Sequence, residues 1–367
     1  MISVKGVARA AVVAAMVLAM GGAALGDTWG WQGAGTAGNT ATDPTEPTTQ
    51  WNIASNWGGT LPEGKHMDTA AINPTNAGHI YAATGNFFSV QVGGTSTEAA
   101  LYVTDGVDFT SSMLLVGLGI FNSNDAGKFG RVIQTGGTVN IGVNPLELGF
   151  WPEGQGTYEL RDGSLTTVGT NYCGRQGSGY FIQTGGVYTA ETVMLGFLSG
   201  SSGTYELKGG RLVAEKIVMQ ENATFSFTGG KLDIEMISSG LTNSGGALVA
   251  RRETYIQGDY IQTKGALEIT LGEGTHDILD VLGSVNITGG NLDVVLDAGY
   301  APTPGDTFTI ISGGGSPVNL EFETIADGYR VYADGNDVVL QFVPEPATLS
   351  LLALGGLAAL VRRRRRK

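Results

Sequence analysis

The residues that could do chemistry are few in this 367-residue chain, and the densest group is a short acidic stretch. Glu273, Asp277 and Asp280 lie close together with His276 between them. Carboxylates at this spacing suit a calcium site or an acid–base pair, but Ca²⁺ takes about 6–8 oxygen ligands. The same residues also fit a solvated turn that leads into a strand. We favour that structural interpretation and predict no metal site.

The single cysteine, Cys173, lies between Tyr172 and Gly174 in a turn region. A thiol nucleophile needs a neighbouring base, and no histidine is near it in the sequence. We therefore expect a packed side chain with no catalytic role. One cysteine also excludes a disulfide framework and any cysteine-rich zinc or iron–sulfur module.

Other catalytic patterns are absent from the sequence. There is no Gly-x-Ser-x-Gly nucleophile elbow and no phosphate-binding loop. A polysaccharide lyase of the β-helix type would need a basic residue beside acidic calcium ligands on one wall, and no local cluster indicates this. The sequence therefore predicts a protein that is not an enzyme, with no catalytic residues and no cofactor. The basic residues that could serve such a wall are scattered: Arg175, Arg211, Arg251 and Arg252.

The N-terminal end has the three-part pattern of a secretory signal. Lys5 and Arg9 precede an apolar stretch over residues 10–25, which ends in small residues. This order predicts a signal helix over residues 1–26 that signal peptidase removes between Gly26 and Asp27. An uncleaved anchoring helix is the alternative, and the polar sequence that follows disfavours it.

The C-terminal end carries a second targeting signal. Pro344-Glu345-Pro346 precedes a 15-residue apolar run over residues 347–361, which predicts a short transmembrane helix. About 20 residues is the usual length of such a helix, so this one requires a thinned bilayer or arginines that reach the far surface. The positive charges should stay in the cytoplasm. They are Arg362, Arg363, Arg364, Arg365, Arg366 and Lys367.

This order of triplet, apolar run and basic tail resembles the PEP-CTERM sorting signal of Gram-negative-type bacteria. The resemblance covers Val343 to Lys367 and implies recognition by an exosortase, which cleaves near Pro344, Glu345 and Pro346. It also implies transient inner-membrane anchoring before release to the cell surface or the extracellular space. The alternative is an ordinary tail anchor in which the triplet occurs by chance.

The middle of the chain is repetitive. The sequence Ile-Gln-Thr-Gly-Gly occurs at residues 133–137 and again at 182–186, and Gly-Thr-Tyr-Glu-Leu occurs at 156–160 and 203–207. Turn glycines recur at intervals of about 20–26 residues, a period typical of repeat architectures. They are Gly137, Gly163, Gly186, Gly210 and Gly230, followed by Gly265 and Gly290.

Each repeat combines a glycine turn with strands of period two. Leu232, Ile234 and Met236 alternate with polar residues, and residues 267–271 and 292–296 follow the same pattern. Such alternation gives one buried and one exposed face, and one unit of this length cannot bury its inner face alone. The sequence therefore predicts an all-β fold, a right-handed parallel β-helix of stacked coils. A β-propeller with blades of about 40–45 residues is the competing architecture.

The segments beside the repeats differ from them. Four of the five tryptophans lie within residues 27–75, which we interpret as an N-terminal cap, although exposed tryptophans could also stack on sugars. Residues 76–278 are the predicted β-helix repeats, and residues 279–342 a C-terminal strand cap. These flanking segments resemble those of autotransporter-passenger-like β-helix proteins with PEP-CTERM tails. That resemblance implies the fold and an exported surface role.

Composition narrows the function further. Glycine makes up 59 of the 367 residues, more than twice its usual share of about 7 %. The net charge of −13 becomes −20 when both ends are left out, which argues against a nucleic-acid partner. We expect a structural or adhesive protein of the cell surface or matrix, associated with exopolysaccharide. A carbohydrate-active β-helix enzyme, either a lyase or a hydrolase, is the alternative.

Overall fold

The structure is a computed structural model, and it describes residues 28–30, 69–72, 79–81, 85–93, 99–118, 129–315 and 318–343. Every regular element in these ranges is a β-strand, so the predicted all-β class is confirmed. The predicted signal helix (1–26) and transmembrane helix (347–361) lie outside the described residues. In the part that the structure describes, no helix is long and apolar enough to cross a membrane.

The strands follow one another along the whole described chain. The first fourteen are β1 (Thr28–Gly30), β2 (Thr69–Ile72), β3 (His79–Tyr81), β4 (Gly85–Val92), β5 (Ala99–Val103), β6 (Asp108–Val116), β7 (Phe129–Ile141), β8 (Leu146–Leu148), β9 (Gln155–Thr167), β10 (Thr170–Cys173), β11 (Ser178–Gln183), β12 (Val187–Leu195), β13 (Ser202–Leu207) and β14 (Arg211–Met219). The remaining fourteen are β15 (Ala223–Phe227), β16 (Lys231–Ile237), β17 (Leu241–Val249), β18 (Thr254–Ile256), β19 (Tyr260–Gly272), β20 (Thr275–His276), β21 (Leu279–Val281), β22 (Val285–Ile287), β23 (Asn291–Leu296), β24 (Thr307–Gly313), β25 (Asn319–Leu320), β26 (Thr324–Ile325), β27 (Tyr329–Asp334) and β28 (Asp337–Phe342).

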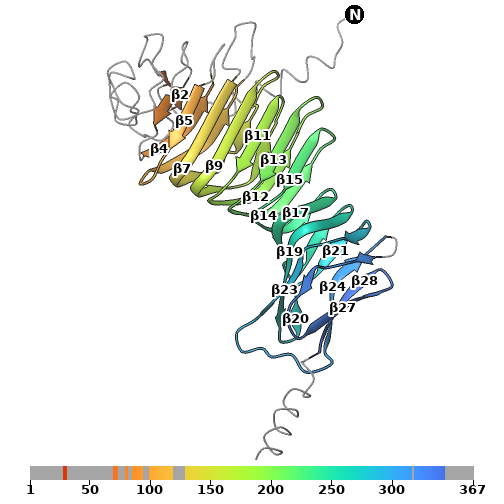
Figure 1. Ribbon diagram of the computed structural model, residues 1–367. Coiled ribbons are helices and arrows are strands. Elements are labelled where there is room, and N and C mark those ends of the chain that lie inside the picture. The colour runs from red at the N-terminus through yellow and green to blue at the C-terminus, as the bar shows by residue number, and fades with distance from the viewer. Residues whose placement is uncertain are drawn as a thin grey trace, which may run out of the picture.

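The strands stack in parallel, one coil on the next. Strand β11 pairs with β9 on one side and β13 on the other, and its Gly179 lies opposite Gly156 and Gly203. Each of these partners is one repeat away in the sequence, at the spacing that the turn glycines predict. Figure 1 shows the strands stacked along one axis, with a change of direction near β17 and β19.

Three hydrogen-bonded ladders run along the stack. The first ladder contains the start of β9, followed by β11, β13 and β15. The second contains the end of β9 and the starts of β12, β14 and β16. The third contains β8, β10 and the ends of β12 and β14. Each coil therefore passes through the first, second and third ladder in turn, and the inner faces enclose a single hydrophobic core.

The C-terminal end closes the stack differently. Parallel pairing continues to β25 and β26, and then β28 pairs antiparallel with both β24 and β27. Among the described strands, the only other antiparallel pair is β19–β20. The parallel ladders do not fit the β-propeller alternative.

Glycine at the turns is a requirement of stacking. Gly210 has a φ of +71°, and a Cβ atom there would lie 2.3 Å from the carbonyl oxygens of both Gly185 and Gly186, one coil earlier. A side chain at this place would therefore collide with the backbone and also strain its own residue. Close coil contacts of this kind explain much of the glycine excess.

The two repeated motifs meet inside the stack. Gln183 of Ile-Gln-Thr-Gly-Gly is fully buried, and its Nε2 donates to the turn carbonyl of Gly186 and to that of Arg211 in the next coil. Its Oε1 accepts the phenol proton of Tyr205, which belongs to Gly-Thr-Tyr-Glu-Leu in that next coil. Tyr158 and Gln134 form the same pair two coils earlier. Each motif therefore recurs every second coil, because one coil supplies the buried glutamine and the next coil supplies the tyrosine that donates to it.

Some details differ from the sequence predictions. Gly246 forms the turn of a coil that the glycine spacing did not include: its neighbour Ala247 pairs with Lys231 and with Ala266. Leu296 is 43 % exposed instead of buried, because only the start of β23 is covered by the next strand, β26. Met236 is only half-buried, because the chain turns from the second ladder to the third and Ile237 takes the inner position.

Candidate functional site

The acidic stretch forms a small hairpin. Strand β20 folds back on the end of β19, and His276 contacts the carbonyl oxygen of Thr309 at 3.0 Å. Asp277 continues this pairing: its Oδ2 accepts a 2.8 Å hydrogen bond from the backbone amide of Thr270, whose carbonyl accepts the Asp277 amide. Asp277 therefore closes the hairpin, whereas Glu273 lies exposed at the turn and Asp280 lies on β21.

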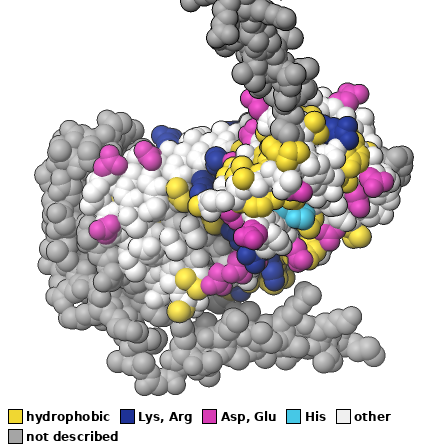
Figure 2. All heavy atoms as spheres, turned by 90° about the horizontal axis from the view of Figure 1, so that it is seen from below, with side chains coloured by type: hydrophobic (Ala, Val, Ile, Leu, Met, Phe, Trp, Pro, Cys, Tyr) yellow, Lys and Arg dark blue, Asp and Glu magenta, His cyan; other side chains and the backbone are white. Residues whose placement is uncertain are grey.

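The hairpin borders a groove of about 410 Å³, which gathers charged residues from several coils. Figure 2 shows acidic and basic side chains around the histidine on the face seen from below. The groove combines part of the acidic stretch with two of the scattered arginines, while Glu273 and Asp280 do not line it. Its charged and titratable lining residues are Asp233, Arg251, Arg252, His276, Asp277 and Asp297.

Arg251 is committed to ion pairs. Its Nε donates to Asp233 at 2.5 Å and its Nη1 to Glu235 at 2.8 Å. Burial alone would lower the pKa of the guanidinium, but the hydrogen bonds and charges of these two carboxylates outweigh it and raise the pKa. Arg251 therefore stays protonated and cannot serve as the base of a lyase.

The surroundings of Asp277 favour the neutral form of its carboxyl, whereas those of Arg251 favour the charged form. Burial raises the pKa of its carboxyl, and the nearby charge of Asp297 raises it further, against the hydrogen bonds from Thr270 and the charge of His276. The Asp277 residue is 8 % exposed. In the part of the chain that the structure describes, no group of three or more His, Cys, Asp and Glu side chains is arranged to hold a metal ion.

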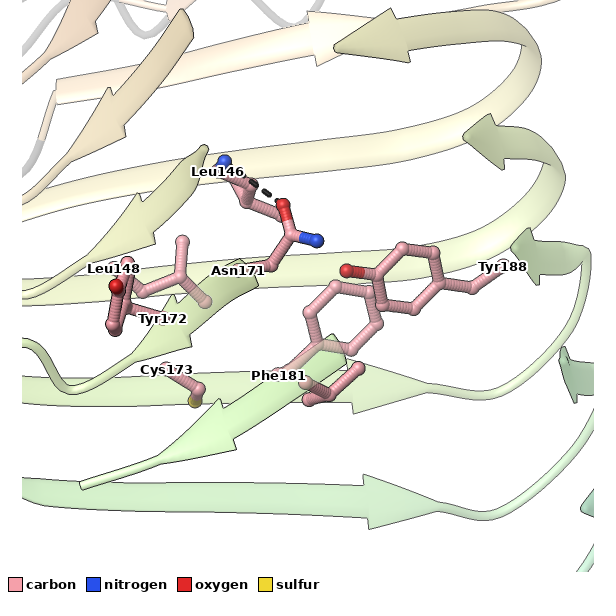
Figure 3. A pocket seen from close by; sticks show the side chains of 8 residues that line it. Leu146, Leu148, Asn171, Tyr172, Cys173, Phe181 and Tyr188 are labelled. Atoms are coloured by element: carbon pink, nitrogen blue, oxygen red, sulfur yellow. Dashed lines mark hydrogen bonds between the residues drawn. The ribbon is translucent and has the colours of Figure 1, made fainter. Parts of the chain in front are cut away.

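Cys173 lies inside the stack. The side chain is 3 % exposed, and the thiol contacts the carbonyl oxygen of Thr204 at 3.3 Å. Burial raises the pKa of the thiol to about 12. The adjoining cavity, shown in Figure 3, has a volume of about 10 Å³, which is about the room of one water molecule. A thiol in this environment is not a nucleophile.

The sorting residues adjoin the last strand. Strand β28 ends at Phe342, and the amide of Val343 donates to the carbonyl of Gly328 at 2.7 Å. Pro344, Glu345 and Pro346, the basic tail from Arg362 to Lys367, and the Gly26–Asp27 cleavage position lie outside the described residues.

Comparison with known families identifies this end of the chain. The family model of the PEP-CTERM protein-sorting motif matches residues 342–366. The chain carries a PEP-CTERM sorting motif. The motif implies an exported protein that an exosortase processes and that reaches the cell surface. No curated protein matches the chain.

Sequence reasoning missed the groove because its members come from different coils. Arg251 reaches back across one coil boundary to Asp233. A search for opposite charges about one coil apart would have found this pair. The sequence also held a signal for a different surface, away from the groove: the Leu-Gly-Phe repeat at residues 148–150 and 195–197 places aromatic side chains at equivalent positions outside the core.

Proposed function

We propose that the chain is an exported scaffold of the cell surface or extracellular matrix, built as a right-handed parallel β-helix and associated with exopolysaccharide. The observation that carries this proposal is the parallel, in-register stacking of coils around one continuous core. Right-handed crossovers are strongly favoured between parallel strands. A rod of this kind offers a long surface for repeated weak binding, and multivalent contacts raise the avidity of weak sites.

The proposed delivery follows from the two ends. Signal peptidase removes residues 1–26, residues 347–361 hold the precursor in the inner membrane, and exosortase cleaves near Glu345. The mature protein then contains an N-terminal cap to residue 75, repeats to residue 278 and a C-terminal cap to residue 342. Its negative charge keeps it soluble.

Cell fractionation of a Glu345→Ala variant tests the delivery. We expect an unprocessed precursor in the membrane fraction, whereas the control Glu321→Ala, an exposed ectodomain position, should be processed and released. Normal processing and release of Glu345→Ala would contradict exosortase recognition at this triplet.

A carbohydrate-active enzyme is the second candidate, and the groove beside Asp277 is the observation that favours it. Asp277 and Asp297 are neighbouring carboxyls, and the pKa of Asp277 is raised; glycoside hydrolysis uses such a pair as acid and base or nucleophile. The hydrogen bond from Thr270 to Asp277 supports the structural role that we prefer. Release of reducing ends from polysaccharides separates the two: activity that disappears in Asp277→Asn and persists in Asp306→Asn would establish the enzyme and overturn the scaffold proposal.

A further inference from the structure

Aromatic side chains gather outside the core where the third ladder turns toward the first. We call Phe150, Trp151, Tyr172 and Phe197, together with Arg175, the aromatic strip. Phe197 is 38 % exposed, and the other members are half-buried. These rings lie together outside the core, and grouped apolar side chains at the surface mark binding surfaces.

The strip follows the repeat of the stack. The backbone amide of Phe150 donates to the carbonyl oxygen of Gly117, one coil earlier. In the same way, the amide of Phe197 donates to the carbonyl oxygen of Gly174, and the amide of Leu198 to the backbone carbonyl oxygen of Arg175. Cys173 also pairs in register with Leu148 and Leu195. Phe150, Arg175 and Phe197 each lie two residues after one of these three and thus occupy equivalent places on three successive coils. Strands in a sheet are spaced by about 4.8 Å, so Phe150 and Phe197 are separated by about 10 Å along the axis.

Contacts within the strip fix its members. The guanidinium of Arg175 lies 5.1 Å from the ring centre of Phe150 and 5.4 Å from that of Tyr172. Tyr172 in turn contacts Phe197, with ring centres 4.9 Å apart, and Phe150 contacts Trp151 edge-on at 4.6 Å. Side chains that are held before binding lose little entropy when a ligand arrives.

The positive charge of the strip is already balanced. Nη1 of Arg175 donates to both carboxylate oxygens of Glu147, at 2.6 and 2.7 Å, and Glu147 is 2 % exposed. The guanidinium plane therefore contributes a flat surface beside the rings, while the buried carboxylate of Glu147 balances its charge. An anionic ligand gains little here, and the acidic protein repels it.

We propose that the aromatic strip binds an uncharged, extended polysaccharide chain of equatorially linked hexopyranoses. The flat faces of such sugars carry apolar C–H groups that pack on aromatic rings. One sugar unit is about as long as one coil is thick, so alternate units face Phe150 and Phe197 and the unit between them faces Tyr172 and Arg175. This inference rests on the proposed glycan-associated function and assigns it a site and a ligand class.

Calorimetric titration of the full chain in detergent micelles tests the proposal. The probes are β-1,4-linked hexamers of glucose, mannose and N-acetylglucosamine, with a β-1,4-linked hexamer of mannuronate as the charged comparison of the same linkage. We expect at least one neutral hexamer to bind, and the mannuronate hexamer to bind at least tenfold more weakly. Phe197→Ala and Tyr172→Ala should each weaken binding of the neutral hexamer about tenfold, and Phe197→Trp should retain it.

Tyr180→Ala is the matched control, because Tyr180 is 42 % exposed on the first ladder and lies outside the strip. It should bind as the unchanged chain does. The proposal is overturned if no neutral hexamer binds, if the charged hexamer binds more tightly, or if Tyr180→Ala loses as much affinity as Phe197→Ala. Self-association that Phe197→Ala abolishes would also overturn it, because the strip would then be an interface between copies. None of these results depends on processing at Glu345, so the proposed delivery and the proposed glycan binding at the aromatic strip can fail separately.

Discussion

The phenol of Tyr205 donates a 2.6 Å hydrogen bond to Oε1 of Gln183, one coil earlier in the stack. Both side chains are fully buried, and Nε2 of Gln183 is used by turn carbonyls. The pair therefore joins two coils through the core, in addition to the backbone ladders. Since a buried amide oxygen has no water to replace a lost partner, the tyrosine hydroxyl should matter to folding.

Tyr205→Phe removes only this hydroxyl. We expect the free energy of unfolding to fall by about 1–3 kcal/mol, because Oε1 of Gln183 is left buried without its donor. Urea unfolding followed by circular dichroism measures the change. Tyr180→Phe removes an exposed hydroxyl and serves as the control, with no shift expected. Equal midpoints for the two variants would show that the buried pair contributes nothing.

Alanine substitutions at two glycines with similar backbone angles distinguish the cost of backbone strain from the cost of a steric collision. Gly200 has a φ of +86° and open space within 4 Å of where a Cβ atom would lie, whereas a Cβ at Gly210 would collide with two carbonyl oxygens. Gly200→Ala should cost about 1–2 kcal/mol from the backbone angle alone. Gly210→Ala should cost more than about 3 kcal/mol. Guanidinium unfolding midpoints measure both, and equal costs would contradict the stacking argument.

Cys173 should resist alkylation in the folded protein. Its thiol is buried and its pKa is raised to about 12, so almost no thiolate is available at pH 8. We expect iodoacetamide to leave the native chain unlabelled over hours and to label it completely in urea, as measured by mass spectrometry. Rapid labelling without denaturant would mean that the stack opens at this coil.

Asp277 should make stability depend on pH. Its pKa is raised in the folded state, so the folded protein holds a proton that the unfolded chain releases near pH 4. The resulting stabilisation is present below pH 4 and is lost as pH rises through the folded pKa. Asp277→Asn removes this titration, and its melting temperature should therefore fall less between pH 4 and pH 6.5 than that of the unchanged chain. An identical change in both proteins would contradict the assignment.

Much of the fold is predictable from local signals. Turn glycines such as Gly186 and Gly210 mark coil boundaries because the positive φ and the close approach of the next coil both exclude a side chain. The coil around Gly246 escaped prediction because this glycine lies closer to Gly230 and Gly265 than the other turn glycines lie to one another. Leu296 was wrongly predicted as buried, because alternation shows which face a residue takes but not whether another strand covers it.

The candidate site was less predictable. The acidic stretch around Asp277 was visible in the sequence, but its partner Thr270 and the neighbouring Asp297 were not. Arg251 and Asp233 meet because the stack brings successive coils about 4.8 Å apart, whatever residues lie between them.

The sequence by itself determined the length of most repeats, the all-β class and the sorting motif, because each depends on residues that are neighbours in the chain. Tertiary structure alone decided that Tyr205 meets Gln183, that Arg251 is held by two carboxylates, and that Phe150 and Phe197 flank Arg175. These contacts join different coils, and their register follows from hydrogen-bond pairing between strands. A small change in coil length would shift each of them, so no local pattern can specify which residues meet.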